Sequence, residues 1–282
     1  MSVKKHFALI GNRLTHTVSP YIHNCLFELS GIDGDYEVFD FPEEELSSNI
    51  KNLKSLSGFN VTIPHKTKII PFIDKIDGFA KICCAVNTVK CGTETIGYNT
   101  DGEGMEQALS LNGFSFKGNI AVCGAGGTAR TAAFLAALHK CEVFLLVRES
   151  GIKRAEDLKN DIEKETGVKA RVVTGDEEKH SFDLLINATP CGMFPNVGEM
   201  PVSKKTLEST KAVFDAIYNP EKTELLKTAE RLNIPASGGM PMLVMQAVKA
   251  QEIWNGAKFS EADIRELIIQ SNIYMRSIFE KI

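Results

Sequence analysis

The segment 119–147 restricts the fold of this chain more than any other part of the sequence. An apolar run at 119–123 leads into the loop Gly124-Ala125-Gly126-Gly127-Thr128-Ala129, which is followed by an alanine-rich helical pattern at 130–138 and a second strand-like run. In dinucleotide-binding units the first glycine makes a tight turn, the second admits a pyrophosphate at the helix N-terminus, and a small final residue allows close helix packing. This order predicts a doubly wound Rossmann domain. A glycine-rich turn that only packs a helix tightly is the alternative.

The end of the second strand bears on the choice of cofactor. Arg148 follows this strand directly, and Arg154 lies farther along the predicted helix. An acidic residue at this place binds the ribose hydroxyl of NAD, whereas arginine suits the additional phosphate of NADP. The two arginines therefore favour NADP, while Glu149 leaves NAD open. An Arg154 that only faces solvent is the structural alternative.

The rest of the chain alternates between short apolar runs and helical patterns. A length of 282 residues predicts about two domains, and the alternation predicts an α/β protein with mostly parallel sheets and a cleft between the domains. Apolar spacing at 101–112 predicts a helix that connects the domains, and the pattern is purely helical after 239. The predicted strands lie at 7–10, 36–39, 59–63, 120–123, 143–147, 184–187 and 213–217.

Polar side chains gather near the ends of apolar runs in the N-terminal part. Asn60, Thr62 and Lys66 form one cluster, Asn87 belongs to a second, and Asp101 comes just before the glycine loop domain. Removing a hydride from a secondary alcohol requires a group that takes up the hydroxyl proton, and Lys66 and Asp101 are the candidates. The residues leave open which of the two carries the proton. A solvated surface Lys66 and an Asp101 that only caps a helix are the structural alternatives.

A hydroxyl-rich segment near the N-terminus predicts the start of a helix. Ser19 precedes Pro20, which predicts serine as the N-cap and proline at the first helical position. In an extended segment Thr17 and Ser19 would point the same way, beside the positive helix end, and could hold a carboxylate without an arginine. In the alternative, Ser19 caps the helix and Thr17 has no role. His16 and His23 are interpreted as structural.

Composition and charge argue against several other classes of protein. Hydrophobic residues make up 43% of the chain and charged residues 24%, and the net charge of -4 gives no reason to expect nucleic acid or an anionic membrane as a partner. No run approaches the ~20 apolar residues of a membrane helix, and the N-terminus lacks a signal-peptide pattern. The seven cysteines are scattered and lack metal-ligand spacing, which favours reduced thiols, a cytoplasmic location and no metal site.

The ordered motifs resemble the shikimate dehydrogenase family over nearly the whole chain. The matching segments are His16-Thr17-Val18-Ser19-Pro20 with His23-Asn24, then 60–66, 85–88, 99–102, the glycine loop with Arg130, 187–193, 215–220, and 239–243 with Gln246. Agreement at so many ordered places is not expected by chance.

The resemblance implies an N-terminal α/β substrate domain, 1–102 with 238–282, and an NADP-binding Rossmann domain, 103–237. It also implies reversible, NADP-linked reduction of 3-dehydroshikimate to shikimate, a step towards chorismate and the aromatic amino acids, with Lys66 and Asp101 as the catalytic pair. The implied substrate residues are Thr17, Ser19, Asn60, Thr62, Asn87, Asp101, Tyr218 and Gln246. The implied cofactor residues are Gly124, Ala125, Gly126, Gly127, Thr128, Arg148, Arg154, Thr189, Gly239 and Met242.

Three departures from the family pattern leave alternatives open. Thr17 stands where the family more often has serine, Val147-Arg148-Glu149 replaces the usual Asn-Arg-Thr, and Arg13 replaces a common proline. The nearest alternative is therefore a quinate/shikimate dehydrogenase that uses NAD. A non-catalytic nucleotide-sensing module would not need the polar strand-end residues together, and a methyltransferase would not need arginines after the second strand. The oligomeric state is left as monomer or homodimer.

Overall fold

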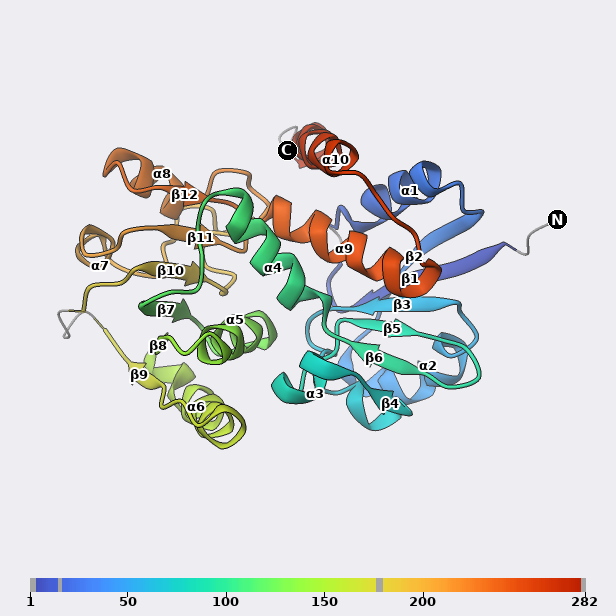
Figure 1. Ribbon diagram of the computed structural model, residues 1–282, viewed down its shortest axis with the longest axis horizontal. Helices are drawn as coiled ribbons and strands as arrows, with labels where there is room; N and C mark the ends of the chain where they lie inside the picture. Colours follow the sequence, from blue (N-terminus) through green and yellow to red (C-terminus); the bar gives the residue numbers. More distant parts are fainter. Residues whose placement is uncertain (1–3, 15–16, 176–179, 280–282) are drawn as a thin grey trace. The chain divides into compact units, whose positions relative to one another are not determined.

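The computed structural model describes residues 4–14, 17–175 and 180–279 (Figure 1). The chain divides into two compact units: unit 1 comprises Met1–Gly104 and Leu243–Ile282, and unit 2 comprises Met105–Met242. Helix α4 (Thr100–Leu111) carries the chain out of unit 1, and helix α9 (Met240–Asn255) brings it back. Unit 1 is therefore discontinuous in sequence, whereas unit 2 is one continuous segment.

Unit 1 is built on a mixed six-stranded sheet in the order β2-β1-β3-β5-β6-β4. Strand β5 runs antiparallel to both β3 and β6, and the other pairs are parallel. The strands are β1 (Lys5–Gly11), β2 (Gly34–Asp40), β3 (Gly58–Val61), β4 (Lys75–Ile76), β5 (Thr88–Lys90) and β6 (Ile96–Tyr98). Strands β4, β5 and β6 were not predicted, because strands of two or three residues are too short for an alternating pattern to be recognised.

The side chains of β1 alternate between two apolar layers of unit 1. Phe7 packs with Trp254 of α9, and the two ring centroids are 4.7 Å apart. Ala8 and Ile10 belong instead to the cluster that contains Phe59. The remaining helical segments are α1 (Ser19–Ser30), η1 (Glu43–Glu45), α2 (Leu46–Leu53), η2 (Ile70–Phe72), α3 (Gly78–Cys83) and α10 (Glu261–Phe279).

Unit 2 is a doubly wound Rossmann fold, as the glycine loop predicts. All six strands are parallel, in the order β12-β11-β10-β7-β8-β9. Numbered within the unit, this is the strand order of dinucleotide-binding folds. The strands are β7 (Asn119–Cys123), β8 (Glu142–Leu146), β9 (Arg171–Val173), β10 (Leu184–Asn187), β11 (Val213–Asp215) and β12 (Ala236–Ser237). The helical segments are α5 (Gly127–Leu138), η3 (Glu149–Gly151), α6 (Ile152–Thr166), α7 (Lys204–Glu208) and α8 (Glu224–Arg231).

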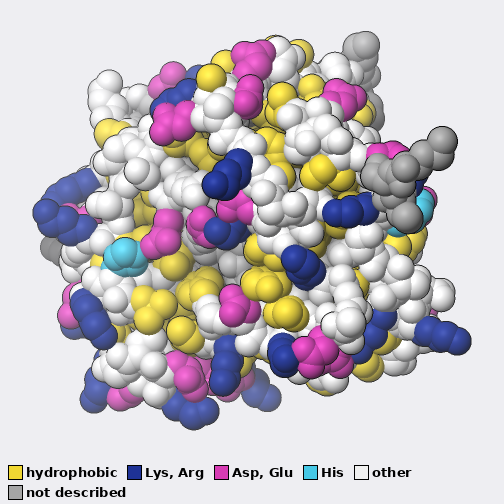
Figure 2. Space-filling model, turned by 45° about the vertical axis from the view of Figure 1, so that its right-hand side comes forward, with side chains coloured by type: hydrophobic (Ala, Val, Ile, Leu, Met, Phe, Trp, Pro, Cys, Tyr) yellow, Lys and Arg dark blue, Asp and Glu magenta, His cyan; other side chains and the backbone are white. Residues whose placement is uncertain are grey.

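Charge and covalent structure add few constraints to this fold. On the face drawn in Figure 2, Lys and Arg side chains lie among Asp and Glu side chains, and neither sign forms a broad field. All seven cysteines lie in the described part of the chain, and none of them forms a disulfide. Among the described residues, no helix combines the length and the apolar character needed to cross a membrane.

Candidate active site

Lys66 and Asp101 form a buried ion pair in unit 1. Lys66 Nζ donates to Asp101 Oδ2 at 2.6 Å, and the two residues are only 8% and 7% exposed. The alternative of a solvated surface Lys66 is therefore wrong. Because burying two charges costs desolvation energy that an apolar pair would avoid, such a pair is a candidate for a functional rather than a stabilising role.

The start of α4 leaves the carboxylate of Asp101 available for Lys66. Asn99 Oδ1 accepts a hydrogen bond from Gly102 N at 3.2 Å, and Asn87 Oδ1 accepts one from Thr100 N at 2.7 Å. These two asparagines satisfy backbone N–H groups of the first turn, which is the role that a capping residue has. The alternative in which Asp101 only caps the helix is thus also wrong.

Asn87 holds the second oxygen of the Asp101 carboxylate. Asn87 Nδ2 donates to Asp101 Oδ1 at 2.8 Å and to Thr100 Oγ1 at 3.0 Å. Gln246 Oε1 lies 3.5 Å from the same Nδ2, although the two residues are 159 positions apart in the sequence. Four of the predicted site residues, Lys66, Asn87, Asp101 and Gln246, are therefore neighbours in unit 1.

Asn60 continues this polar cluster, and Thr62 lies at its edge. Asn60 Nδ2 donates to Thr88 Oγ1 at 2.9 Å and to the carbonyl of Asn87 at 3.2 Å. Thr62 is half-buried, and its N–H donates to Ile10 O at 2.9 Å, although β3 ends at Val61 rather than at the predicted residue 63. Thr88 and Thr100 were not predicted as site residues, although each lies directly beside an asparagine of the polar clusters, Asn87 and Asn99.

The hydroxyl pair Thr17 and Ser19 differs from the prediction in its local backbone. Helix α1 begins at Ser19, its cap residue is Val18, and no side chain caps it. Val18 has helical dihedral angles, φ -96° and ψ -7°, so the predicted extended segment and the serine N-cap are both wrong. Thr17 Oγ1 instead accepts a hydrogen bond from Ser19 N at 3.2 Å, a local bond of the kind that hydroxyl side chains often make. His16 lies outside the described residues.

The loop between β7 and α5 makes a tight turn at Gly124 and has open space at Gly126. Gly124 has φ +102°, and a Cβ on it would lie only 2.9 Å from Thr189 Cγ2, whereas a Cβ on Gly126 would meet nothing within 4 Å. Helix α5 begins at Gly127, three residues before the predicted start, because the loop glycine already forms its first turn. Ala129 is fully buried, and the partly buried Ala125 and Thr128 complete the segment. The N–H groups of this first turn can bind an anion.

A buried polar network supports Thr189 beside this loop. Asn187 Oδ1 accepts hydrogen bonds from Thr189 N at 3.0 Å and Thr189 Oγ1 at 2.7 Å, and Asn187 Nδ2 donates to Asp215 Oδ1 at 3.0 Å. Burial raises the pKa of Asp215 to about 6, against the opposing effect of donors that include Thr223. Asn187 and Asp215 were missed as single residues, although both are polar ends of apolar strands, β10 and β11.

The two predicted arginines are exposed in unit 2. Arg148 precedes η3, has a side chain that is 73% exposed, and lies 3.7 Å from the carboxylate of Glu199. Glu149 is the first residue of η3, and Arg154 is an exposed residue in the first turn of α6. Both guanidinium groups are accessible to a ligand. Two carboxylates accompany Arg148: Glu149 follows it in the sequence, and Glu199 forms an ion pair with it.

The three remaining predicted residues also belong to unit 2. Tyr218 is half-buried, and it lies in a different unit from Lys66 and Asp101. Gly239 N donates to Ile217 O at 2.9 Å, and a Cβ on Gly239 would collide with the carbonyl of Ala216. Met242 is 7% exposed and lies near the start of α9.

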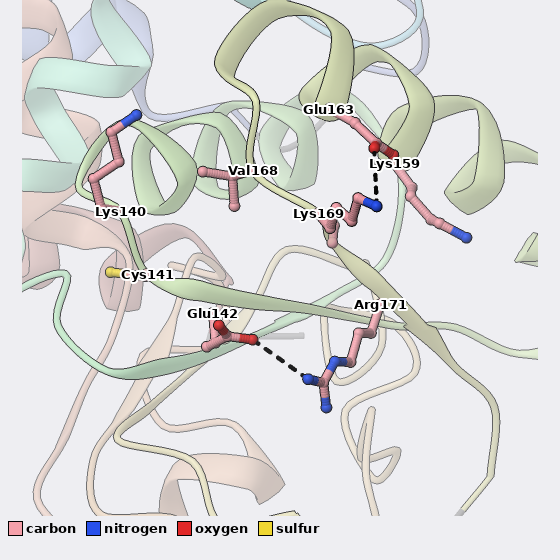
Figure 3. Close-up of a pocket in the computed structure, with 9 residues that line it drawn as sticks. Lys140, Cys141, Glu142, Lys159, Glu163, Val168, Lys169 and Arg171 are labelled. Atoms are coloured by element: carbon pink, nitrogen blue, oxygen red, sulfur yellow. Dashed lines mark ion pairs between the residues drawn. The ribbon is translucent and has the colours of Figure 1, made fainter.

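Unit 2 also has an open pocket of about 570 Å³ at the amino ends of strands β8 and β9 (Figure 3). The pocket lies where β8 begins, whereas ligands of doubly wound folds bind at the carboxyl ends of the strands. Two ion pairs lie among its lining residues: Lys169 Nζ lies 3.7 Å from Glu163, and Arg171 lies 3.6 Å from Glu142. Its position at the start of β8 separates this pocket from the glycine loop, which follows the end of β7.

The Rossmann unit with its glycine loop, together with a unit that buries a lysine–carboxylate pair, defines the class of dinucleotide-dependent dehydrogenases. Residues 9–89 match the family model of the shikimate dehydrogenase substrate binding domain. A curated shikimate dehydrogenase (NADP(+)) from Methanopyrus kandleri is 37% identical over 273 residues, which cover 93% of this chain and 94% of that protein. The chain belongs to the shikimate dehydrogenase family.

Solved structures of the family share the fold of the whole chain. A crystal structure of a shikimate dehydrogenase in complex with NADP+ superposes with a TM-score of 0.87 at 37% identity and covers 95% of each chain. A shikimate 5-dehydrogenase from Listeria monocytogenes in complex with shikimate and NAD superposes with a TM-score of 0.84 at 31% identity, covering 94% of this chain and 96% of that one. Similar proteins have thus been crystallised with either nicotinamide cofactor.

Proposed function

We propose that this chain catalyses the reversible, NADP-dependent reduction of 3-dehydroshikimate to shikimate, a step towards chorismate and the aromatic amino acids. The observation that carries the proposal is the buried pair of Lys66 and Asp101, held in place by Asn87 in a member of this family. In the oxidation direction the hydroxyl proton of the substrate passes to this pair. Because Lys66 Nζ and Asp101 Oδ2 are 2.6 Å apart, a proton taken up by one is shared with the other.

The substrate binds to unit 1 in this proposal. Hydroxyls of the ring meet the amide and carboxylate groups of the polar cluster, and the substrate carboxylate meets the hydroxyls at the start of α1. A ligand that lacks one ring hydroxyl leaves a buried polar group unpaired, at a cost of ~1–3 kcal/mol, so a polyol is selected over its deoxy analogues. The proposed substrate residues in unit 1 are Thr17, Ser19, Asn60, Thr62, Asn87, Asp101 and Gln246, and unit 2 contributes Tyr218.

Unit 2 binds NADP, whose nicotinamide supplies or accepts the hydride when the cofactor is bound. The residues fit such a group because Gly124 has a positive φ and the position of a Gly126 Cβ is open. We assign the pyrophosphate to the glycine loop, including Ala125, Gly127 and Thr128, and the additional phosphate to Arg148 and Arg154. Thr189, Gly239 and Met242 are assigned to the nicotinamide side.

NAD is the second candidate cofactor, and quinate the second candidate substrate. Glu149 and Glu199 place carboxylates near the arginines, which weakens the attraction for the phosphate of NADP, and Thr17 adds a methyl group to the proposed carboxylate site. The test follows nicotinamide absorbance with shikimate and quinate, each paired with NADP and with NAD. A higher kcat/KM for shikimate with NADP is expected. Faster quinate oxidation with NAD would replace the biosynthetic assignment by a catabolic one.

We also infer a cytoplasmic location, which the absence of disulfides among the seven described cysteines supports. We predict that the protein is a monomer or a homodimer, and light scattering of the purified protein distinguishes the two.

A further inference from the structure

Tyr36 on β2 has a buried hydroxyl that none of the roles above uses. The residue is 7% exposed, and burial raises the pKa of its phenol well above the ordinary value of 10. The hydroxyl is therefore protonated over the working pH range. It donates a hydrogen bond to Asn60 Oδ1, with 2.7 Å between the two oxygens.

A neutral histidine fixes the ring of Tyr36. The rings of His23 and Tyr36 stack with centroids 4.1 Å apart and planes inclined by 8°. Gln251 Nε2 lies 3.0 Å from His23 Nδ1, and Asn255 Nδ2 donates to Gln251 Oε1 at 2.8 Å, which sets the orientation of the Gln251 amide. His23 Nδ1 is therefore the acceptor, and burial lowers the pKa of His23 to about 3. The ring that supports Tyr36 stays uncharged.

The hydroxyl of Tyr36 completes the hydrogen bonding of the Asn60 amide except at one place. Both protons of Asn60 Nδ2 have acceptors, Thr88 Oγ1 and the carbonyl of Asn87. Of the two lone pairs on Asn60 Oδ1, Tyr36 uses one. The remaining capacity of this side chain is a single acceptor position on Oδ1. His23 Nε2 makes no hydrogen bond and so leaves this position open, although an interaction with Asn60 partly opposes the lowering of the His23 pKa.

We propose that Tyr36 is a positioning residue for substrate recognition: its hydroxyl holds Asn60 so that Oδ1 accepts a hydrogen bond from one ring hydroxyl of a cyclic polyol. This proposal rests on the proposed function and deepens it. Tyr36 reaches the Lys66–Asp101 pair only through Asn60 and Asn87, whereas Asn87 is also held by the bond that its Oδ1 accepts from Thr100 N at 2.7 Å. Tyr36 therefore affects the binding of the substrate more than the proton transfer.

The first test replaces Tyr36 by Phe, which removes only the hydroxyl. We expect KM for shikimate to rise by about tenfold, with kcat and KM for NADP within about twofold of the wild-type values, because one buried hydrogen bond is lost. Tyr274→Phe is the matched control, since Tyr274 is 37% exposed and stacks only on Tyr21 among the described aromatic rings. This control should have wild-type kinetics.

A double-mutant cycle separates positioning from a general structural effect. If Tyr36 acts through Asn60, adding Tyr36→Phe to Asn60→Ala produces no further rise in KM, because the group that Tyr36 positions is already gone. A merely structural contribution would add in full to the effect of Asn60→Ala. Full additivity, or a wild-type KM in Tyr36→Phe alone, would overturn the proposal.

A second readout does not depend on the reaction. With 15N-labelled asparagine, the side-chain amide signal of Asn60 is identified by its absence in Asn60→Ala. In Tyr36→Phe we expect this signal to shift and its hydrogen exchange to accelerate, and an unchanged signal would show that Tyr36 does not hold Asn60. Wild-type protein without shikimate turnover would refute the proposed function, and the amide signal would still decide whether Tyr36 holds Asn60.

Discussion

The Lys66–Asp101 pair has properties that make each partner depend on the other. Both side chains are almost entirely buried, and the carboxylate has Asn87 as its second donor. Removing the lysine would leave Asp101 buried with only neutral donors, which is unfavourable for a charged group. The two residues thus form a single electrostatic unit, and a change to either one is expected to affect both proposed roles, substrate binding and proton transfer.

Lys66→Ala should lower kcat by at least about 100-fold, because a positioned proton-transfer group typically contributes 10²–10⁴-fold. The Kd for NADPH, measured by fluorescence titration, should stay within about twofold, since the glycine loop belongs to unit 2. Lys68→Ala is the control, because Lys68 has a 55% exposed side chain that pairs with Glu43. Near-normal turnover by a folded Lys66→Ala protein would remove Lys66 from the mechanism.

Single residues differ in how far the sequence predicts their arrangement. Lys66 and Asp101 were candidates because both follow apolar runs, and the resemblance to the family implied that they act as a pair. The arrangement of Thr17 and Ser19 was predicted wrongly. The prediction required an extended backbone, whereas Val18 adopts helical dihedral angles. The role of Tyr36 was invisible, since its hydroxyl contact with Asn60 joins residues on different strands.

At the scale of elements, the four longer or more apolar Rossmann strands were predicted, whereas the short strands β9 and β12 of unit 2 and β4, β5 and β6 of unit 1 were not. Strands β7, β8, β10 and β11 are continuous apolar runs, as expected for a parallel sheet covered on both faces. Strands β5 and β6 have three residues each, and β5 begins within the polar motif of Asn87 and Thr88. Tertiary pairing with β3, rather than local pattern, makes these residues a strand.

The end of β11 should make the stability of the protein depend on pH. Because the pKa of Asp215 is raised from 3.8 to about 6, folding favours its protonated form, and this contribution is complete below pH 3.8 and lost as the pH rises through 6. The loss amounts to about 3 kcal/mol. The asparagine of Asp215→Asn cannot ionise. In urea titrations, the unfolding free energy of this variant should therefore increase relative to that of the wild type from pH 4 to pH 7.

Asp183→Asn provides a control of opposite sign. The pKa of Asp183 is lowered, chiefly by its hydrogen bond with Lys211, so its contribution is present at neutral pH and lost as the pH falls through the lowered value. The unfolding free energy of Asp183→Asn should therefore increase relative to that of the wild type as the pH falls. A constant difference between Asp215→Asn and the wild type from pH 4 to pH 7 would mean that folding does not raise the pKa of Asp215.

At the scale of the whole molecule, the two units differ in which segments of the chain they need in order to fold. Unit 1 requires the returning segment, because Trp254 packs on Phe7 and donates from Nε1 to Val89 O at 2.9 Å. A side chain on Gly58 would collide with Trp254, so β3 and α9 are fitted closely to each other. Unit 2 contains all of its own strands between Met105 and Met242.

A chain that ends at Met242 should therefore lose the fold of unit 1 and keep that of unit 2. We expect rapid hydrogen exchange in β1 and β3, protected amides in β7 and β10, NADPH binding close to that of the full chain, and no shikimate oxidation. A chain that ends at Lys258 is the control: it keeps Trp254 and loses α10, of which Leu267 and Met275 are the apolar residues buried in the described part. It should retain protection in β1. Equal loss of protection in both units of the shorter chain would show that unit 2 cannot fold without unit 1, and the continuity of its sequence would then be no guide to its independence.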